Sequence, residues 1–400
     1  MSVGGHFARP RFGAMWSERM SVDATAWQEL RKQMPVCERW AYFDHAAVAP
    51  IPDVARRAII RWAEEAATEA ELAWPRWRRR LEDVRTMLAR LLNADRDEIA
   101  LVRNTTEGLS IIAEGFPWQA GDNVVVAEDE FPTNLFPWLN LRSRGVVTRL
   151  VPSRQERVGP EDFARCVDAR TRMIAVSWVA FATGHRRNLD GFARLAHSIG
   201  AWLVVDGIQA LGAFPLDTRK IPIDALAADG HKWLLGPEGA GCLFVRRERI
   251  GQLRPVQVGW NSVRHAGRFD RPEFALKDSA ARFEGGSPNM AGFHALAASL
   301  ELLEPFPLEG RAARLRFLTD RVVQCVRELG GVVCSDRSEN AFSGIVAAEF
   351  PGVSAAAIKQ RCLELGVVLN ERAGRVRISP HVYTSEEDIA RLRDALKSVL

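Results

Sequence analysis

The chain has 400 residues, of which 47% are hydrophobic and 26% are charged. This balance is typical of a globular enzyme and excludes a disordered chain or a small scaffold held together by disulfides. Lysine and arginine together number 54 against 50 acidic residues, which leaves a formal net charge of +4. Because a nucleic-acid-binding protein needs a strongly positive surface to displace counterions, we expect no nucleic-acid partner.

Targeting and metal-binding features are weak. No apolar run reaches the roughly 18 residues that cross a bilayer, so we expect no membrane partner. The six cysteines show no CxxC or Cys/His spacing, which predicts reduced, buried thiols in a cytoplasmic protein and no metal site. Residues 1–22 contain arginines and few acidic side chains, and we expect them to form a disordered or accessory extension.

The first part of the chain is predicted to be helical. Ala24 to Arg39 has the pattern of one helix, and Asp53 to Leu92 contains long helical patterns that Pro75 interrupts. From about Ile99 short apolar strands alternate with helices, as in strands 123–127, 173–179 and 201–205 and helix 190–198. Such alternation predicts an α/β fold with a mostly parallel sheet.

Beyond Pro288 the pattern changes again. Long helices at 291–303 and 310–329 are followed by short strands at 344–349 and 375–379. This order is typical of a smaller α+β domain. We therefore expect an N-terminal segment that packs with the small domain, a large domain and a small C-terminal domain, at residues 23–60, 61–288 and 289–400.

Two chemically distinctive residues follow buried strands. Asp206 ends the apolar segment 201–205, and ligands of parallel sheets bind outside the carboxyl ends of the strands. An aspartate that merely caps a loop is the alternative if this segment is taken alone. Lys232 lies between apolar residues in a chain with only six lysines. A buried lysine can lose its proton and act as a nucleophile, for example in a Schiff base.

An anion site is predicted further upstream. Thr105 and Thr106 precede the apolar helical run 109–113, so two hydroxyls and free backbone N–H groups meet at a helix start. A helix cap explains these threonines equally well on their own. Together with the carboxylate and the lysine, however, they supply what pyridoxal phosphate needs: a phosphate anchor, a partner for its protonated pyridine nitrogen, and an amine that holds its aldehyde as an imine.

Six segments, in this order, resemble the class V aminotransferase family, which includes cysteine desulfurases, kynureninases and isopenicillin N epimerases. They are Tyr42-Phe-Asp-His-Ala-Ala47, Val102-Arg-Asn-Thr-Thr-Glu-Gly108, Val205-Asp-Gly-Ile-Gln209, Gly230-His-Lys-Trp233, Glu284-Gly-Gly-Ser-Pro-Asn289 and Arg375-Val-Arg-Ile-Ser379. The resemblance extends from about Trp40 to the C-terminus. It implies a pyridoxal-phosphate enzyme of fold type I, with a mostly parallel seven-stranded sheet in the large domain.

The resemblance also implies roles for single residues around the cofactor ring. Lys232 would form the Schiff base, and Asp206 would pair with the pyridine nitrogen. Gln209 matches the side chain beside the phenolic oxygen. Phe131 stands where desulfurases place a stacking histidine, and its ring can stack on the pyridine face.

The phosphate contacts implied by the resemblance come from two subunits. Thr105 and Thr106 match phosphate-binding positions, and His231 precedes the lysine as in desulfurases. Gly286 and Ser287 match a contact that the family supplies from the second subunit. A homodimer with a shared active site is therefore implied.

Three residues are predicted to bind the substrate. Arg377 matches the arginine that holds the α-carboxylate of the substrate, a role that suits a planar, two-pronged donor. His45 could face the substrate as an acid or base, or could be a structural histidine. Trp260 resembles a kynureninase substrate-pocket position, with a core aromatic as the alternative.

Besides Phe131, the chain departs from the desulfurase pattern in three places. The segment Asn370–Arg375 is short and has no cysteine where desulfurases carry a reactive one, which argues against persulfide transfer to protein thiols. Cys362 is predicted to be a buried packing residue. Asp229 replaces a serine near the phosphate, so its carboxylate must point away or the phosphate must be held differently. Phe181 replaces an asparagine near the cofactor ring.

Several reactions are compatible with these residues. In each, a small α-amino acid bound to the cofactor loses its α-proton to Lys232. Loss of a β-substituent would make the protein a lyase, with C–S cleavage included, and we rank this first. An aminotransferase or an epimerase of the same family is the alternative, and a non-catalytic interaction protein with this fold is the alternative of another class. A nicotinamide dehydrogenase is not expected, because no GxGxxG follows strand 123–127.

Overall fold

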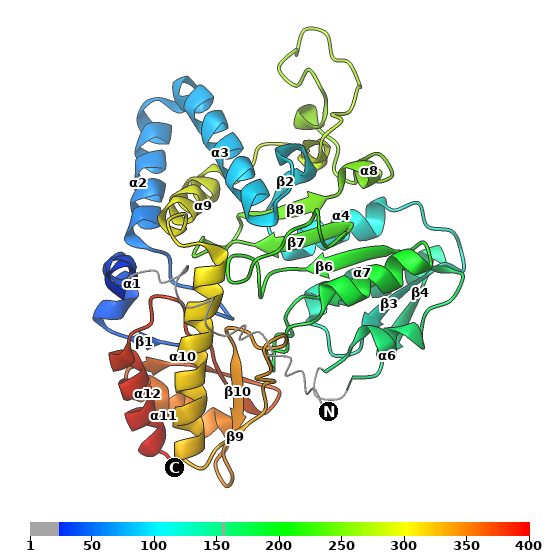
Figure 1. Ribbon diagram of the computed structural model, residues 1–400. Helices are drawn as coiled ribbons and strands as arrows, with labels where there is room; N and C mark the ends of the chain where they lie inside the picture. Colours follow the sequence, from blue (N-terminus) through cyan, green and yellow to red (C-terminus); the bar gives the residue numbers. More distant parts are fainter. Residues whose placement is uncertain (1–23, 154–156) are drawn as a thin grey trace, which may run out of the picture.

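The computed structural model describes residues 24–153 and 157–400 (Figure 1). The expectation for residues 1–22 lies outside the described residues. The chain begins with helices α1 (Ala24–Lys32), α2 (Asp53–Thr68) and α3 (Trp74–Leu92). The single helix predicted up to Arg39 was wrong in length, because α1 ends at Lys32 and Pro35 starts a separate short turn. Pro75 occupies the first turn of α3, where its missing N–H costs nothing.

A seven-stranded sheet forms the centre of the molecule, in the order β2-β8-β7-β6-β5-β3-β4. Its strands are β2 (Ile99–Val102), β3 (Asn123–Ala127), β4 (Val147–Val151), β5 (Thr171–Ser177), β6 (Trp202–Asp206), β7 (Ala225–Asp229) and β8 (Gly241–Val245). The five strands from β4 to β7 are parallel, and β8 and β2 are antiparallel to their neighbours. The predicted α/β class with a mostly parallel sheet is therefore confirmed.

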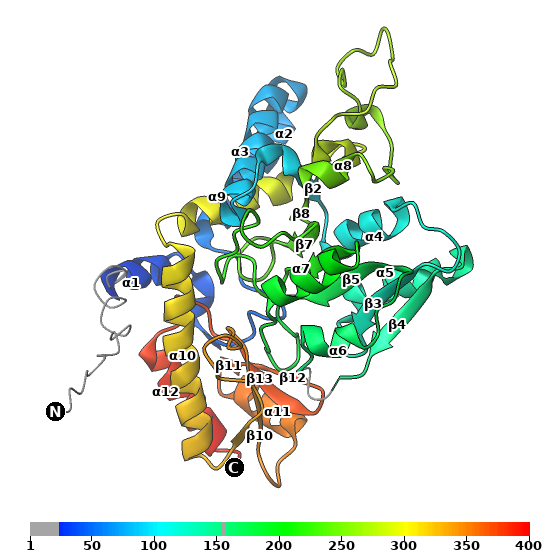
Figure 2. The same ribbon diagram turned by 45° about the vertical axis from the view of Figure 1, so that its right-hand side comes forward.

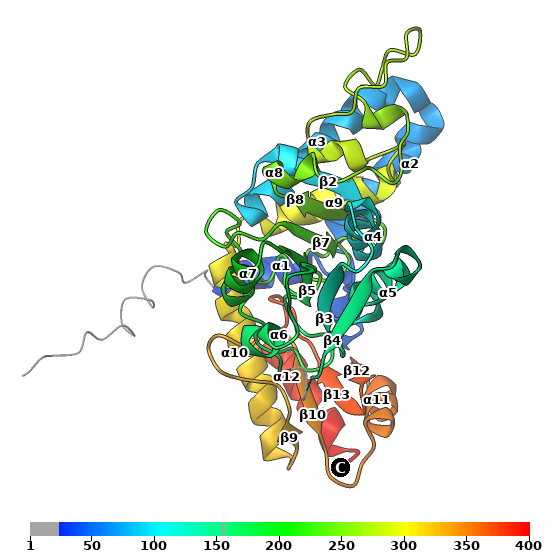
Figure 3. The ribbon, with the colours of Figure 1, turned by 90° about the vertical axis from the view of Figure 1, so that its right-hand side faces the viewer.

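Helices cover both faces of this sheet (Figure 3). Helices α3, α7 (Leu189–Ser198) and α9 (Met290–Leu303) pack on one face, and α4 (Thr105–Gly115) and α5 (Phe136–Asn140) pack on the other. Along β3, Val125 contributes to the first core and Val124 to the second, as the two-residue period of a strand requires. Because both faces are buried, inner strands such as β3 are nearly continuous apolar runs instead of alternating patterns, whereas the edge strand β4 is partly exposed.

A second, smaller layer is built around an antiparallel sheet in the order β12-β13-β10-β9 (Figure 2). Its strands are β9 (Val332–Val333), β10 (Val346–Glu349), β12 (Asn370–Arg372) and β13 (Arg375–Ile378), and the helices beside it are α10 (Leu308–Glu328), α11 (Ala355–Glu364) and α12 (Glu386–Lys397). Two shorter helices are next to strands of the large sheet in the sequence: α6 (Pro160–Ala164) lies between β4 and β5, and α8 (Arg247–Ile250) follows β8.

The first described elements contact the C-terminal part of the chain. Strand β1 (Ala41–Tyr42) pairs in parallel with β11 (Val367–Val368), and Arg31 of α1 forms an ion pair with Asp388 of α12 at 2.5 Å. Helix α2 packs instead on α9. The division of the chain at residues 60 and 288 stays a prediction.

The segment between α8 and α9 protrudes from the body (Figures 1 and 3). It carries three exposed aromatic side chains, those of Trp260, Phe269 and Phe274. Within the described residues, no helix is both long and apolar enough to cross a membrane.

Candidate active site

A cavity of about 310 Å³ lies at the carboxyl ends of β6 and β7, where the first turn of α4 and the strands of the small sheet converge. Its lining includes eight of the predicted site residues: Thr105, Thr106, Phe131, Asp206, Gln209, His231, Lys232 and Arg377. Residues that are far apart in the sequence are thus brought to one place. The other four predicted site residues, His45, Trp260, Gly286 and Ser287, do not line this cavity.

Asp206 lies at the end of β6, beside Ser177 of β5. Its side chain is buried, and its Oδ1 accepts a hydrogen bond from the backbone N of Ile208 at 3.0 Å. Burial raises the pKa of Asp206 to about 7, and the positive charge of Lys232 opposes this shift. A cationic group bound against this carboxylate would favour its ionised form.

Lys232 lies on the turn that follows β7. The backbone N of Ala49 donates to the carbonyl of His231 at 2.7 Å, which ties this turn to the N-terminal segment. The ammonium Nζ lies 6.0 Å from the centroid of the Phe131 ring. Burial lowers the pKa of Lys232 to about 8, and the charge of Asp206 opposes this shift. The amine is therefore close to its reactive, neutral form near physiological pH.

The start of α4 presents an anion-binding surface. Asn104 caps the helix, since its Oδ1 accepts from the backbone N of Glu107 at 2.8 Å. The hydroxyl of Thr105 accepts from the backbone N of Asp229 at 3.0 Å, and the hydroxyl of Thr106 lies 2.9 Å from that of Thr133. Two hydroxyls and the positive end of a helix dipole thus meet at the cavity.

Asp229 also faces this end of the cavity, and it is paired. Its Oδ2 lies 2.9 Å from Nδ1 of His231, and its Oδ1 accepts from the backbone N of Gly230 at 2.7 Å. A phosphate held here would have the threonine hydroxyls, the helix start and the histidine as its partners.

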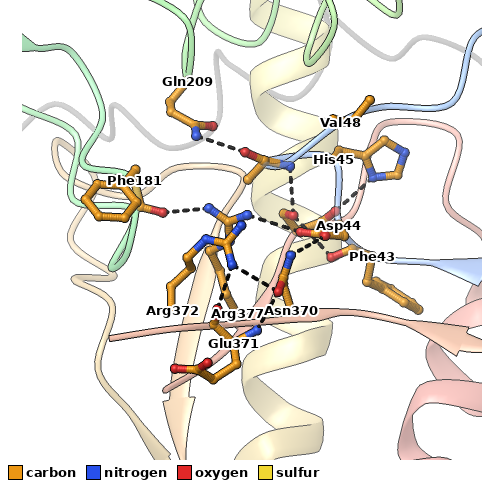
Figure 4. A network of polar contacts seen from close by, with 12 residues as sticks. Phe43, Asp44, His45, Val48, Phe181, Gln209, Asn370, Glu371, Arg372 and Arg377 are labelled. Carbon is orange, nitrogen blue, oxygen red and sulfur yellow. Dashed lines mark hydrogen bonds and ion pairs between the residues drawn. The ribbon is translucent and has the colours of Figure 1, made fainter. Parts of the chain in front are cut away.

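The opposite end of the cavity carries a network around Arg377 (Figure 4). Nη2 of Arg377 lies 3.1 Å from Oδ1 of Asp44, and Nη1 donates to the carbonyl of Phe181 at 2.9 Å. Asn370 donates to the other oxygen of Asp44 at 2.6 Å, and its own Oδ1 accepts from Nη1 of Arg372 at 3.1 Å. Both arginines line the cavity. The guanidinium of Arg377 is thus held in a fixed orientation.

The residues present fit pyridoxal phosphate. Asp206 suits a protonated pyridine nitrogen, Lys232 suits an aldehyde, and the start of α4 suits a phosphate. In the described part of the chain, the buried Oε1 of Gln209 has no hydrogen-bond partner, while its Nε2 donates to the carbonyl of Ala46 at 3.0 Å. An unpartnered polar atom at this place is suited to a ligand oxygen or its proton.

Comparison with known proteins decides the family. The aminotransferase class V family model matches residues 41–392. The chain belongs to the class V aminotransferase family. A probable cysteine desulfurase from Methanothermobacter thermautotrophicus is 29% identical, over 93% of this chain and 98% of that relative. The cysteine desulfurase CsdA from Escherichia coli has a similar structure, with a TM-score of 0.82 and 26% identity, over 93% of this chain and 98% of that one.

The cystine C–S lyase C-DES shares the fold, with a TM-score of 0.85 at 23% identity, over 92% of this chain and all of that one. Membership of the family confirms the predicted enzyme class and cofactor: the class V protein is a pyridoxal-phosphate-dependent enzyme. The roles of its single residues stay predictions.

His45 occupies a closed position next to the site. Its Nδ1 lies 2.8 Å from the carbonyl of Ser379 and its Nε2 lies 2.6 Å from the hydroxyl of Tyr383, so both ring nitrogens are engaged. Burial lowers the pKa of His45 to about 4, so the ring is neutral at physiological pH. Trp260 is on the protruding segment, and Gly286 and Ser287 are exposed.

Asp44 was not identified as a site residue from the sequence, and Arg372 was considered only, with Arg375, as an alternative to Arg377 for the carboxylate anchor. Asp44 lies within the first family-like segment, next to His45, and its position in that segment was the available signal. Arg372 pairs in register with Arg375, and Asn370 with Arg377, so Arg372 and Arg377 project from the same face of the β12–β13 hairpin. Because side chains alternate between the two faces of a strand, the position of Arg372 relative to Arg377 was the sequence signal that could have found it.

The cysteines lie away from the cavity. Among the described residues that line it there is no thiol. Cys362 is buried in the core of the small layer, and burial raises its pKa to about 11. The expectation that all cysteines are buried was wrong for Cys37, Cys166 and Cys334, which are half-buried.

Proposed function

We propose that this enzyme is a β-lyase that cleaves a carbon–sulfur bond of an amino acid and releases the sulfur as a small molecule. The proposal rests on the set of side chains that line one cavity. Lys232, Arg372 and Arg377 line it together, and no thiol is among its described lining residues. A reactive cysteine would be needed to carry sulfur on the protein itself.

The chain's own residues account for the first half of the reaction. Arg377, held by Asp44 and Phe181, orients a substrate through its α-carboxylate. Lys232, with its pKa lowered to about 8, takes the α-proton. Bound pyridoxal phosphate supplies the electron sink that makes this proton acidic and allows a β-substituent to leave.

The second arginine supports a substrate with two carboxylates. Arg372 contacts Oδ1 of Asn370 and the carbonyl of Glu371, and within the described residues it forms no ion pair. Cystine, the substrate named for the fold relative C-DES, carries two carboxylates. Cleavage of cystine consumes one water and yields cysteine persulfide, pyruvate and ammonia, which balances all atoms.

The assay combines the loaded enzyme with L-cystine and measures pyruvate, ammonia and free persulfide. Arg372→Ala should raise the KM for cystine by about 10-fold or more, since a hydrogen bond to a charged group contributes about 1.5–3 kcal/mol. The KM for S-methylcysteine, which has one carboxylate, should change little. Arg375→Ala is the matched control, because Arg375 pairs with Glu349 and does not line the cavity.

Other products would contradict the proposal. A keto acid formed without ammonia would identify an aminotransferase, and inversion of the amino acid would identify an epimerase. A persulfide trapped by alkylation on Cys362 during turnover would show desulfurase chemistry instead.

We also propose that the enzyme works as a homodimer. Gly286 and Ser287 are exposed and lie outside the cavity of their own chain, and the aromatic residues of the protruding segment, Trp260, Phe269 and Phe274, are exposed near them in sequence. A second subunit would cover these side chains. Light scattering of the active enzyme tests this, and a fully active monomer would contradict it.

A further inference from the structure

A buried ion pair joins Glu130 and Arg187 beside the active site. Oε1 of Glu130 lies 2.7 Å from Nη1 of Arg187, and both side chains are 1% exposed. The carboxylate of Glu130 also accepts from the backbone N of Ser177 at 2.9 Å and from the Ser177 hydroxyl. Arg187 donates to the Ser177 carbonyl at 3.0 Å. The pair is therefore fixed to the end of β5.

This pair touches two parts of the cofactor site. Glu130 directly precedes Phe131, whose ring lines the cavity. Ser177 is the register partner of Asp206, and the backbone N of Trp178 donates to the Asp206 carbonyl at 2.9 Å. A shift of the pair would therefore move both the aromatic ring and the strand next to the buried carboxylate.

The two charges act on Asp206 in opposite directions. The negative charge of Glu130 raises the pKa of Asp206, while the positive charges of Arg187 and Lys232 lower it. The charges that shift the pKa of Lys232 itself are those of Asp206, Arg377, Asp229 and Asp44. A change in the pair should therefore act first on Asp206.

Packing alone does not account for an ion pair at this position. Replacement of a buried ion pair by apolar side chains of similar volume is often neutral or stabilising. The carboxylate of Glu130 accepts two hydrogen bonds from Ser177 and one from Arg187, so its position is fixed. The pair thus places one fixed negative and one fixed positive charge beside Asp206.

We propose that Glu130 and Arg187 are positioning residues of the cofactor site, which hold Phe131 at the cavity and balance the charge beside Asp206. The proposal depends on the cofactor site of the family and not on the proposed C–S lyase reaction. It would hold equally for an aminotransferase. Its test therefore measures cofactor binding and not turnover.

The probe is pyridoxamine phosphate, which has the pyridine and phosphate groups but no aldehyde to react with Lys232. Its affinity for the apo protein is measured by titration calorimetry between pH 6 and 9. Because ionised Asp206 binds the pyridine nitrogen, affinity should rise with pH through the pKa of Asp206. Arg187→Met should move this midpoint upward by about one pH unit, and Glu130→Gln should move it downward by a similar amount.

The opposite signs distinguish this role from a structural one, because simple disruption would weaken binding in both variants. The double variant, with both charges removed, should return the midpoint toward that of the wild type. Arg187→Lys keeps the charge and should restore the midpoint even if Arg187→Met folds poorly. Equal midpoints in all variants, or shifts of the same sign, would overturn the proposal.

Arg249→Met is the matched control. Arg249 also pairs with a buried carboxylate at 2.7 Å, that of Asp224, but this pair lies at the amino ends of β6 and β7, away from the cavity, where Asp224 accepts from the backbone N of Leu203. Its loss should lower stability without moving the midpoint for pyridoxamine phosphate. An equal shift in this variant would contradict a local effect of Glu130 and Arg187.

Discussion

The substitution Gly108→Ala tests whether the start of α4 holds the cofactor phosphate. Gly108 lies where α4 packs on β7, and a Cβ added there would come within 2.7 Å of the Cβ of Ala227. Ordinary contact begins at 3.4 Å, so the helix must move away by about 0.7 Å. The same movement would stretch the 3.0 Å bond from the Asp229 backbone N to the Thr105 hydroxyl beyond hydrogen-bonding distance.

Two effects on stability oppose each other. Overpacking costs about 1–3 kcal/mol, and the better helix propensity of alanine returns about 1 kcal/mol. The net loss of unfolding free energy should therefore be about 0–2 kcal/mol. The Kd for the cofactor should rise by about 10-fold or more, because the displaced helix start would contribute hydrogen bonds to a charged phosphate.

The assay measures the Kd of pyridoxal phosphate by absorbance and the Tm of the apo protein. Ala227→Gly in the same chain restores the space, so the double variant should recover most of the affinity. Gly251→Ala is the control, because a Cβ at Gly251 has no atom within 4 Å. If Gly108→Ala binds the cofactor as tightly as the wild type, the phosphate is not anchored at α4.

Three further predictions concern the cavity itself. Lys232→Ala should abolish the borohydride-reducible adduct with pyridoxal phosphate, and an identical adduct by mass spectrometry would exclude Lys232. In the wild type, attachment of the cofactor should speed up as pH rises through about 8, where Lys232 loses its proton. Asp206→Asn removes the charge that raises this pKa, so stopped-flow absorbance should place the midpoint lower, and turnover should fall by orders of magnitude. Arg377→Ala should raise the KM for α-amino acids by about 10-fold or more, and unchanged binding by the spectral shift would place the carboxylate anchor elsewhere.

The core of the sheet could be predicted from sequence because its signals are local. Strand 123–127 was predicted with the bounds that β3 has, since its four consecutive apolar residues between turn signals leave little choice. Strands β2 and β8 were not predicted. They form an antiparallel pair, β8 is also antiparallel to its other neighbour β7, and the pairing of β2 with β8 joins segments about 140 residues apart. Periodicity within one segment contains no information about such a partner.

Site residues could be predicted where a single side chain has a chemical property that its local sequence makes conspicuous. Lys232 and Asp206 are unusual in their local sequence, and the cavity brings them together. The pair of Glu130 and Arg187 was not predicted, because a glutamate after a strand and an arginine before a helix are ordinary in any α/β protein. Only the fold shows that these two side chains meet in a buried place.

The two halves of the cavity are built by different parts of the chain. The half that we propose for the cofactor, with Asp206 and Lys232, comes from the ends of β6 and β7 in the large sheet. The half that we propose for the substrate centres on Arg377, which is held by Asp44 from the N-terminal segment and by Phe181 from the loop after β5. Asp44 has a raised pKa because it is buried, and the charge of Arg377 opposes this shift. Since the opposite charges of Asp44 and Arg377 offset the cost of burying each other, we expect the proposed substrate anchor to form only when the segment around Asp44 and the C-terminal part have both folded against the large sheet.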